Sequence, residues 1–340
     1  MNQPLSKDFG VGVVVGKFYP FHRGHKYLIE TALERCESVF VIVTEEQDQA
    51  YSATERADWI YSEFYNEFSL YTLVTPNNLP NEPGPWAERT RNLVPSVEAV
   101  FTSESYGPPW AEALGVEHVH VDMDRRRFPT SGTEIRADIL SNWHWLADGT
   151  KAALAPLVVA IGAESTGSTT ISKYLASYYG TAWVPEFGRE WWDARWFASR
   201  DFDQYDFDRI IDGQNYMTDR LRMLANKVLI SDTDNLATVV FEERYLGRAS
   251  DRTLHEAKAH LPDLYLVTDT DIPWVNDGMR ESEKERDWMQ ARMLELVEQS
   301  GVPYIVLSGD KGRRANDAIK RIDQLLVDRF GDPLPITEVL

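Results

Sequence analysis

A glycine-containing turn between an apolar strand and a helix constrains the fold of this chain more than any other feature. Residues 11–15 are apolar and mostly β-branched, as in a buried parallel strand, and a helical pattern of leucine and isoleucine follows the turn. Gly16 and Gly24 let the backbone of the turn approach a ligand closely. A helix N-terminus offers unpaired N–H groups to an anion, so we expect His22 and His25 to lie beside a bound triphosphate. Two histidines in a turn could also be surface decoration, so support from elsewhere in the chain is needed.

Apolar segments and helical patterns alternate along the whole chain. The expected strands are residues 11–15, 39–44, 70–74, 99–102 and 118–121 in the first half and residues 157–161, 228–230, 264–267 and 304–307 in the second. This alternation predicts an α/β protein with two doubly wound parallel sheets, whose ligands bind at the carboxyl ends of the strands. A closing helical segment is expected over residues 136–145, and the pattern restarts near residue 150. We therefore expect two domains, residues 1–150 and 151–340.

The acidic composition narrows the possible partners. The chain of 340 residues has a formal net charge of −19, which disfavours non-specific nucleic-acid binding because that binding depends on Lys and Arg. Cys36 is the only cysteine, so an internal disulfide and a cysteine-rich zinc site are excluded. Residues 1–10 lack the apolar core of a signal peptide, and no apolar run approaches the roughly 20 residues that span a bilayer. We expect a cytoplasmic protein that binds small molecules and neither nucleic acid nor membrane.

A second glycine-rich turn follows the strand expected over residues 157–161. It has the form of a P-loop, whose backbone N–H groups surround the phosphates of a nucleotide. The expected phosphate-binding residues are Gly162, Glu164, Ser165, Thr166, Gly167, Ser168, Thr169 and Thr170. The Thr169 hydroxyl is also the expected Mg²⁺ ligand from this loop. A strand-to-helix turn that binds no nucleotide is the alternative.

Ser168 occupies the position that a P-loop normally gives to lysine. The missing cation removes a contact to the β- and γ-phosphates, and such charge-assisted hydrogen bonds are typically worth about 1.5–3 kcal/mol each. Lys173 lies roughly 140° further round the following helix, so it is expected to point away. Arg189 is a better-placed replacement, as is Arg280 from a glycine-hinged segment that has the composition of a lid.

Two carboxylates follow the strand expected over residues 228–230. Asp232 occupies a Walker-B position and would hold Mg²⁺ directly or through water, and either Asp232 or Asp234 could orient an attacking hydroxyl. Alone, these carboxylates could belong to an ordinary loop. Arginines at and after residues 277–280 could likewise lie on a solvated helix face rather than in a lid.

Two motifs of the first domain resemble the signatures of a known superfamily. Residues 16–25, GKFYPFHRGH, are similar to the GxFxPxHxGH signature of the HxGH nucleotidyltransferases, and residues 131–136, SGTEIR, are similar to the second signature, S-[ST]-T-x-[IL]-R. With the second domain included, the chain resembles the NadR family along nearly its whole length. That family joins a nicotinamide mononucleotide (NMN) adenylyltransferase to a ribosylnicotinamide kinase. The further matches are residues 54–56, 103–107, 121–122, 162–170, 185–190, 206–214, 232–234, 243–247, 271–274 and 277–280.

The resemblance implies a Rossmann-like nucleotidyltransferase domain followed by a P-loop kinase-like domain. In the first, the NMN phosphate would attack the α-phosphorus of ATP and give NAD and pyrophosphate. In the second, the 5′-hydroxyl of ribosylnicotinamide would attack the γ-phosphorus of ATP and give NMN. ATP would be the co-substrate of both reactions and Mg²⁺ a cofactor. Related nucleotidyltransferases often form dimers or tetramers, so a homo-oligomer is also possible.

The resemblance also assigns roles to residues of the first domain. His22, His25 and Arg136 would be catalytic, and Arg56 would bind substrate. Residues on the ATP phosphates would be Gly16, Lys17, Phe18, Gly24, Ser131 and Thr133. Trp86 would stack on the nicotinamide ring, with packing in the core as an equal alternative.

In the second domain, Asp232 and Asp234 would be catalytic, and Arg280 would contact phosphate. Ribosylnicotinamide would be held by Glu186, Arg189 and Asp206. Ser168 leaves three possibilities open: a kinase with a relocated cation, a slow kinase, or a nucleotide-binding regulator of the first domain. A protein that senses NAD and ATP without catalysis is a further alternative. Some family members carry an N-terminal DNA-binding module, which is not expected here because the first strand begins near residue 11.

Overall fold

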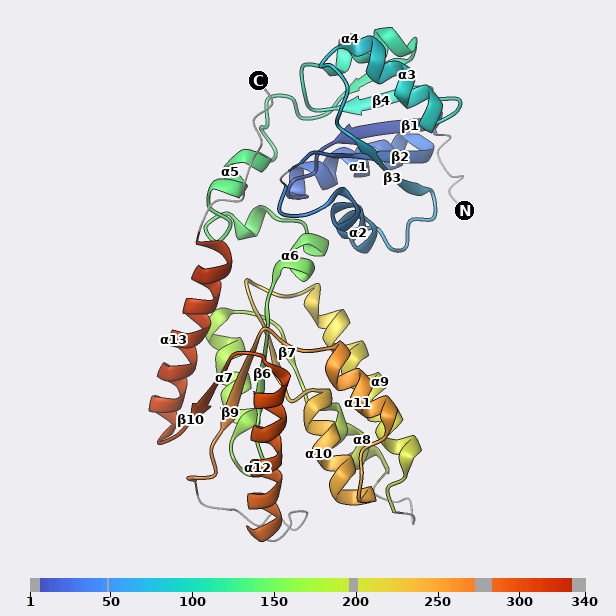
Figure 1. Cartoon of the computed structure of the whole chain (residues 1–340). Helices are drawn as coiled ribbons and strands as arrows, with labels where there is room; N and C mark the ends of the chain where they lie inside the picture. The colour runs from blue at the N-terminus through green and yellow to red at the C-terminus, as the bar shows by residue number, and fades with distance from the viewer. Residues whose placement is uncertain (1–6, 48, 196–200, 273–282, 332–340) are drawn as a thin grey trace, which may run out of the picture. The chain divides into compact units, whose positions relative to one another are not determined.

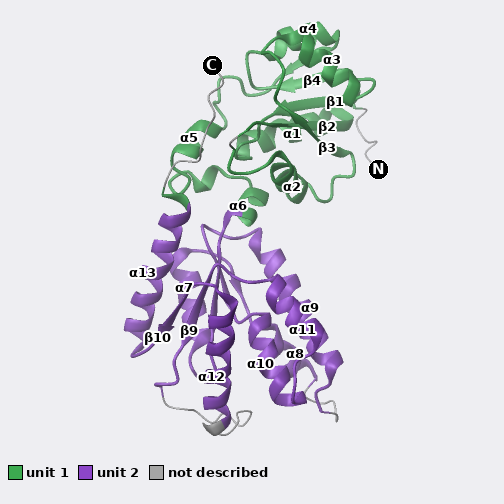
Figure 2. Ribbon diagram, viewed as in Figure 1, with its two compact units in different colours: residues 1–153, 330–340 green, residues 154–329 purple. Residues whose placement is uncertain are grey.

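The computed structural model of the chain describes residues 7–47, 49–195, 201–272 and 283–331. The chain divides into two compact units (Figure 2). Residues 1–153 and 330–340 form unit 1, and residues 154–329 form unit 2. Each unit contains one five-stranded sheet in which every pair of neighbouring strands is parallel. In the described part of the chain, no helix combines the length and the apolar character that crossing a membrane would require.

Unit 1 alternates strands and helices around its sheet (Figure 1). The strands are β1 (Phe9–Gly16), β2 (Cys36–Glu45), β3 (Leu70–Pro76), β4 (Ala99–Thr102) and β5 (Glu117–His120). The helices are α1 (Arg23–Arg35), α2 (Ala53–Glu63), α3 (Pro83–Leu93), α4 (Gly107–Leu114), α5 (Gly132–Ala137) and α6 (Asp148–Leu154), with a 3₁₀ turn at Trp143–Trp145. The strand order β3-β2-β1-β4-β5 reverses direction between β1 and β4. Ligands of open α/β sheets bind at such a switch point, and the histidine-bearing turn follows β1 directly.

Unit 2 is built in the same way around β6. Its strands are β6 (Leu157–Ile161), β7 (Trp183–Val184), β8 (Leu229–Asp232), β9 (Leu264–Thr268) and β10 (Tyr304–Leu307), in the order β10-β9-β6-β8-β7. Its helices are α7 (Ser168–Tyr179), α8 (Phe187–Arg195), α9 (Gln204–Arg222), α10 (Asn235–Leu246), α11 (Asp251–Ala259), α12 (Glu283–Ser300) and α13 (Lys311–Phe330). Strands β6, β8 and β9 are buried along their whole length. Their continuous apolar runs therefore form the core, as expected for parallel strands covered on both faces.

The two parallel α/β sheets confirm the fold class predicted from the sequence. The helix expected over residues 136–145 is wrong, because α5 ends at Ala137 and only a short 3₁₀ turn follows. Asn142 explains the break, since its side-chain amide donates to the carbonyl oxygens of Glu134 (3.2 Å) and Asp138 (2.8 Å). These bonds stabilise a turn in place of a continuing helix. Strand β7 was not expected, because two residues carry no periodic signal.

Candidate active sites

A cavity of about 710 Å³ lies at the carboxyl ends of the strands of unit 1. Its walls include residues at or just after the ends of strands, among them Gly16 at the end of β1, Thr44 in β2 and Ser103 after β4. The histidine turn and the second signature face the same cavity. Of the expected residues, those on its wall are Gly16, Lys17, Phe18, His22, Gly24, His25, Trp86, Ser131, Thr133 and Arg136.

The two histidines form a stacked pair at the start of α1. His22 caps the helix, and its Nδ1 accepts a hydrogen bond of 3.1 Å from the backbone N–H of Gly24, which assigns the proton of the neutral ring to Nε2. The ring of His25 stacks on that of His22 at 3.7 Å between centroids. Burial lowers the pKa of His22 to about 3 and holds the pKa of His25 well below its usual range. Both rings are therefore neutral at physiological pH and would bind phosphate as hydrogen-bond donors, not as cations.

The second signature is attached to the first. Ser131 caps α5 by accepting a hydrogen bond of 3.2 Å from the N–H of Glu134. Gly132 packs against the first turn so closely that a Cβ atom there would lie 2.9 Å from the carbonyl oxygen of Tyr19. Arg136 donates to that same carbonyl and to the hydroxyl of Thr133 (3.0 Å). Residues about 110 positions apart in the sequence thus form one rigid wall of the cavity.

Arg125 also lines this cavity and was not predicted. The carboxylate of Asp122 fixes its loop by accepting the backbone N–H groups of residues 126–128 at 3.0–3.2 Å. The guanidinium of Arg125 lies 2.9 Å from Glu104, and its charge lowers the pKa of His22 more than that of any other neighbouring charge. Three consecutive arginines just before the second signature were the sequence signal that could have revealed it.

Lys17 and Trp86 line the cavity but have partners of their own. The ammonium of Lys17 lies 2.6 Å from the buried carboxylate of Glu46, so a phosphate would compete with this ion pair. Trp86 packs against the apolar cluster that contains Ile42, and it also reaches the cavity. Trp86 can therefore pack in the core and contact a ligand at the same time, although the sequence alone presents these as alternatives.

Arg56 is fully buried, and it lies outside the cavity. The three nitrogens of its guanidinium donate to the carbonyl oxygens of Lys17, Thr44, Tyr51 and Ser52 and to the side chain of Gln49. These bonds tie the start of α2 to the turn after β1. The expected substrate contact is therefore corrected to a structural role, because every nitrogen is already used within the chain.

The cavity of unit 2, about 400 Å³, lies over the P-loop between β6 and α7. Ser165 (φ 61°) and Gly167 (φ 93°) take left-handed backbone conformations that curl the loop around this space. The loop residues on the wall are Gly162, Glu164, Ser165, Gly167, Ser168, Thr169 and Thr170. Thr166 is an exception, since its buried hydroxyl donates to the carbonyl of Ala163 (2.6 Å).

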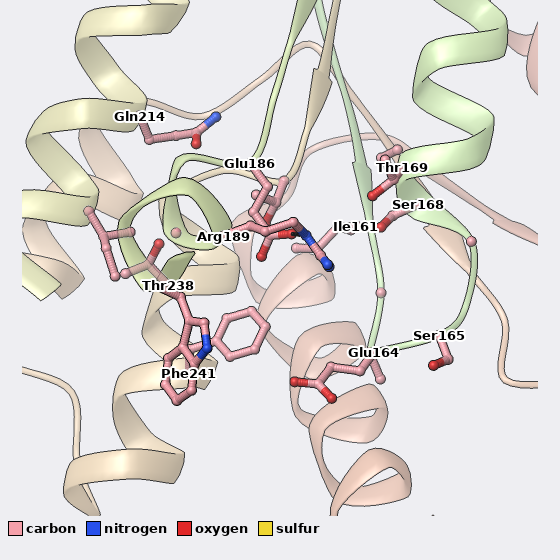
Figure 3. A pocket seen from close by; sticks show the side chains of 18 of the residues that line it. Ile161, Glu164, Ser165, Ser168, Thr169, Glu186, Arg189, Gln214, Thr238 and Phe241 are labelled. Carbon is pink, nitrogen blue, oxygen red and sulfur yellow. Dashed lines mark ion pairs between the residues drawn. The ribbon is translucent and has the colours of Figure 1, made fainter. Parts of the chain in front are cut away.

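Two carboxylates lie beside the P-loop: Asp232 is buried and Glu186 is half-buried. Glu186 lines the cavity, and burial raises its pKa to about 7, helped by the negative charge of Asp232. Burial also raises the pKa of Asp232, against the opposing hydrogen bonds from the hydroxyls of Thr169 and Ser168. Oδ1 of Asp232 is buried and has no hydrogen-bond partner among the described residues. Figure 3 shows Glu186 and Arg189 on the wall opposite Ser168 and Thr169, with Nε of Arg189 3.5 Å from Glu186.

Asp234 and Asp206 have structural roles instead of the expected catalytic and substrate roles. Asp234 caps α10 by accepting two backbone N–H groups at 3.0 and 3.3 Å, and it accepts a 2.6 Å hydrogen bond from the hydroxyl of Tyr265. Asp206 is fully buried, accepts from the indole of Trp191 (3.0 Å) and lies 3.2 Å from Arg195. Neither lines the cavity, so their positions give no support to the expected catalytic and substrate-binding roles. Arg280 lies outside the described residues.

An aromatic wall that the sequence did not reveal completes the cavity of unit 2. Trp192 and Phe202 stack at 4.8 Å with an angle of 13° between their rings, and Tyr245 lies 5.2 Å from Phe202. All three line the cavity together with Phe207 and Phe241. The sequence signal that could have revealed this wall is the excess of aromatic residues over 187–207. Helix and strand patterns alone do not show that these residues lie beside α10.

Comparison with known proteins connects both units to one family. Residues 11–69 match a family model described as the citrate lyase ligase C-terminal domain, and residues 157–314 match one described as an AAA domain. The trifunctional NAD biosynthesis/regulator protein NadR of Escherichia coli K12 is 28% identical over 320 residues, covering 87% of this chain and 78% of that protein. A nicotinamide-nucleotide adenylyltransferase of Picrophilus torridus is 25% identical over 140 residues, covering 40% of this chain and 82% of that protein.

The fold comparison agrees over the full length. A crystal structure of NadR protein in complex with NR superposes with a TM-score of 0.69 at 20% identity, covering 98% of this chain and 99% of the other. A second NadR structure, in complex with NAD and AMP-PNP, gives a TM-score of 0.65 and covers 98% of this chain and all of the other. Both signatures lie on one cavity and a P-loop lies on the other, and the chain is similar to NadR proteins in sequence and fold across both units.

Proposed function

We propose that unit 1 transfers AMP from ATP to NMN and that unit 2 phosphorylates ribosylnicotinamide with ATP. The residues that carry the two activities lie in residues 1–150 and 151–340. The names of the relatives support this assignment, because they include NAD biosynthesis and nicotinamide-nucleotide adenylyltransferase. The ligands of the related structures, NR, NAD and AMP-PNP, are those that the two reactions would use, make or mimic.

The stacked histidine pair beside two arginines is the observation that carries the adenylyltransferase assignment. A phosphate oxygen of NMN forms a bond to the α-phosphorus of ATP while the bond to the bridging oxygen breaks and pyrophosphate leaves. The ring N–H of His22 donates to the phosphates, and Arg125 and Arg136 neutralise the charge that develops on the leaving group. No proton has to be moved by a side chain, which fits two histidines held neutral by burial.

In unit 2, Glu186 is the proposed general base. A carboxyl with a pKa of about 7 can accept a proton at physiological pH. The 5′-oxygen of ribosylnicotinamide forms a bond to the γ-phosphorus, its proton passes to Glu186, and ADP leaves as the bond to the bridging oxygen breaks. The stacked rings of Trp192 and Phe202 offer a flat face to the nicotinamide ring, whose positive charge favours aromatic surroundings.

The residues beside the P-loop fit Mg²⁺. Asp232 offers a buried carboxylate oxygen without a partner in the described chain, and the hydroxyl of Thr169 contacts the same carboxylate. Mg²⁺ at phosphate sites usually takes one or two protein carboxylates and completes its shell with phosphate and water. Asp232 and Thr169 would hold the ion, which when bound would neutralise charge on the β- and γ-phosphates.

Product assays on the full chain test both assignments. With Mg²⁺, ATP and NMN we expect NAD and pyrophosphate; with ribosylnicotinamide in place of NMN we expect NMN, followed by NAD. A protein that only senses nucleotides would make neither product. NAD from NMN but no NMN from ribosylnicotinamide would leave unit 2 as a nucleotide-binding regulator.

A further inference from the structure

The cavity of unit 2 lacks the cation that a P-loop normally supplies. Ser168 begins α7, and its hydroxyl donates to the carboxylate of Asp232. The cavity wall carries Glu164 and Glu186, and Asp232 lies nearby. These carboxylates would repel a bound triphosphate. Phosphoryl transfer depends on positive charge around the moving group, so a substitute must lie on another element.

Three basic residues near the P-loop, Lys173, Arg286 and Arg314, have partners outside the cavity. The ammonium of Lys173 lies 4.4 Å above the ring of Trp183, away from the cavity. Arg286 donates to the carbonyls of Ile272 (3.1 Å) and, more weakly, Ser165 (3.5 Å), and Arg314 donates to the carbonyl of Thr166 (2.6 Å), so both contact the P-loop backbone. Among the described residues that line the cavity, Arg189 is the single basic one.

Arg189 is placed to act on the phosphates. It projects from α8, and Figure 3 shows its guanidinium directed across the cavity toward the wall that bears Ser168 and Thr169. Its charge acts on both carboxylates, since it lowers the pKa of Glu186 and of Asp232. Nε of Arg189 lies 3.5 Å from the carboxylate of Glu186, and half of the Arg189 side chain is exposed.

We propose that Arg189 supplies the positive charge that Ser168 has removed from the P-loop, and that it contacts the γ-phosphoryl group of ATP during transfer. The proposal rests on the kinase function assigned to unit 2. In the reaction the 5′-oxygen joins the γ-phosphorus, Glu186 takes the hydroxyl proton, and ADP carries away the bridging oxygen. Arg189 takes no proton; it stabilises the charge on the γ-phosphoryl oxygens.

A rescue experiment tests this role. We compare kcat and KM for ribosylnicotinamide phosphorylation in the wild type, Arg189→Ala, Ser168→Lys and the double variant. Arg189→Ala should lower kcat at least about 100-fold, the scale seen when one transition-state donor is removed. Ser168→Lys should restore at least about tenfold in the Arg189→Ala background, because it returns the cation to its usual position. Arg189→Lys should keep part of the activity, and Arg220→Ala, on the exposed side of α9, should keep all of it.

Each outcome decides the question. A rise in KM for ribosylnicotinamide without a fall in kcat, or a loss that Ser168→Lys does not relieve, would show that Arg189 only binds substrate. Because NAD formation from NMN reports only on unit 1, thermal unfolding of each variant is compared with that of the wild type to show whether unit 2 is folded. Arg189→Ala should also raise the pH midpoint of the remaining activity, because Arg189 lowers the pKa of Glu186. If the wild type makes no NMN, the kinase assignment fails together with this inference; if it does and Arg189→Ala is unaffected, only the inference fails.

Discussion

In unit 1 His22 and His25 face the cavity beside Arg125 and Arg136, whereas in unit 2 Glu186 faces the cavity beside Arg189 and the carboxyl of Asp232 is buried nearby. Burial favours the neutral form of all four groups, so it lowers the pKa of the histidines and raises the pKa of the carboxyls. The consequences differ, because a neutral histidine donates hydrogen bonds to phosphate at every physiological pH. A carboxyl with a pKa of about 7 instead exchanges a proton within that range. The same physical effect thus fits one site to a reaction without proton transfer and the other to one that needs a base.

The largest effect should come from removing the titrating carboxyl of unit 2. Glu186→Gln keeps the size and polarity of the side chain but cannot accept a proton, so kcat for ribosylnicotinamide phosphorylation should fall about 10²- to 10⁴-fold. NAD formation from NMN should not change. Glu190→Gln, on the exposed side of α8, is the matched control. Retention of more than a tenth of the kinase rate would remove Glu186 as the base.

The matching change in unit 1 is His22→Asn. Asn still provides a helix-capping acceptor, so α1 should form, but the ring N–H directed at phosphate is lost. We expect NAD formation to fall about 100- to 1,000-fold in kcat with kinase activity unaffected. His144→Asn, an exposed histidine of the same unit, provides the control. An equal loss in both variants would contradict a specific role for the stacked pair.

Arg125→Ala should give a smaller loss, because Arg136 remains. One charge-assisted hydrogen bond at a half-exposed side chain is worth about 1.5 kcal/mol, so kcat for NAD formation should fall about tenfold. Arg126→Ala removes the next arginine, which is 84% exposed and paired with Asp124, and should have no effect. If the two variants behave alike, Arg125 does not contact the reacting phosphates.

The smallest effect concerns the pH dependence of the free energy of unfolding. His22 should make this free energy rise with pH, and Glu186 should make it fall with pH. The lowered pKa of His22 stabilises the fold above pH 6.5, and that contribution is lost as the pH falls toward about 3. The raised pKa of Glu186 stabilises the fold below pH 4.5, and that contribution is lost as the pH rises through about 7. In denaturant unfolding, stability should rise more steeply with pH than in wild type for Glu186→Gln between pH 5 and 7, and less steeply for His22→Asn between pH 5 and 6.5. Each slope changes by at most about 1.4 kcal/mol per pH unit. Unchanged slopes would mean that neither group is buried as described.

The sequence predicted the two sheets because their strands are buried and apolar, a pattern that reads directly along the chain. All nine expected strands overlap observed ones, through buried residues such as Val13, Val41 and Val159. The turns of both sites were predicted because each lies within ten residues and begins at a strand end. Residues 136–145 were mispredicted because side-chain bonds of Asn142, invisible to periodicity, end the helix.

Long-range contacts decided the rest of the site. Arg56, Asp206 and Asp234 have residue types suited to binding or catalysis. In the fold, however, their side chains form hydrogen bonds with groups from other elements. The aromatic wall was missed for a related reason. Phe202, just before α9, and Tyr245 in α10 are far apart in the sequence and meet only in the folded chain. No spacing rule connects residues so far apart, so a sequence can nominate site residues but tertiary contacts select among them.

The pH dependence of the two reactions in one preparation tests the contrast between the sites most directly. We would measure kcat for ribosylnicotinamide phosphorylation and for NAD formation at saturating substrates between pH 6 and 8. ATP serves both reactions, so its own titration affects both. With a pKa of about 7 for Glu186, the ratio of the kinase rate to the adenylyltransferase rate should rise about tenfold across this range. A constant ratio, or one that falls as the pH rises, would contradict the account.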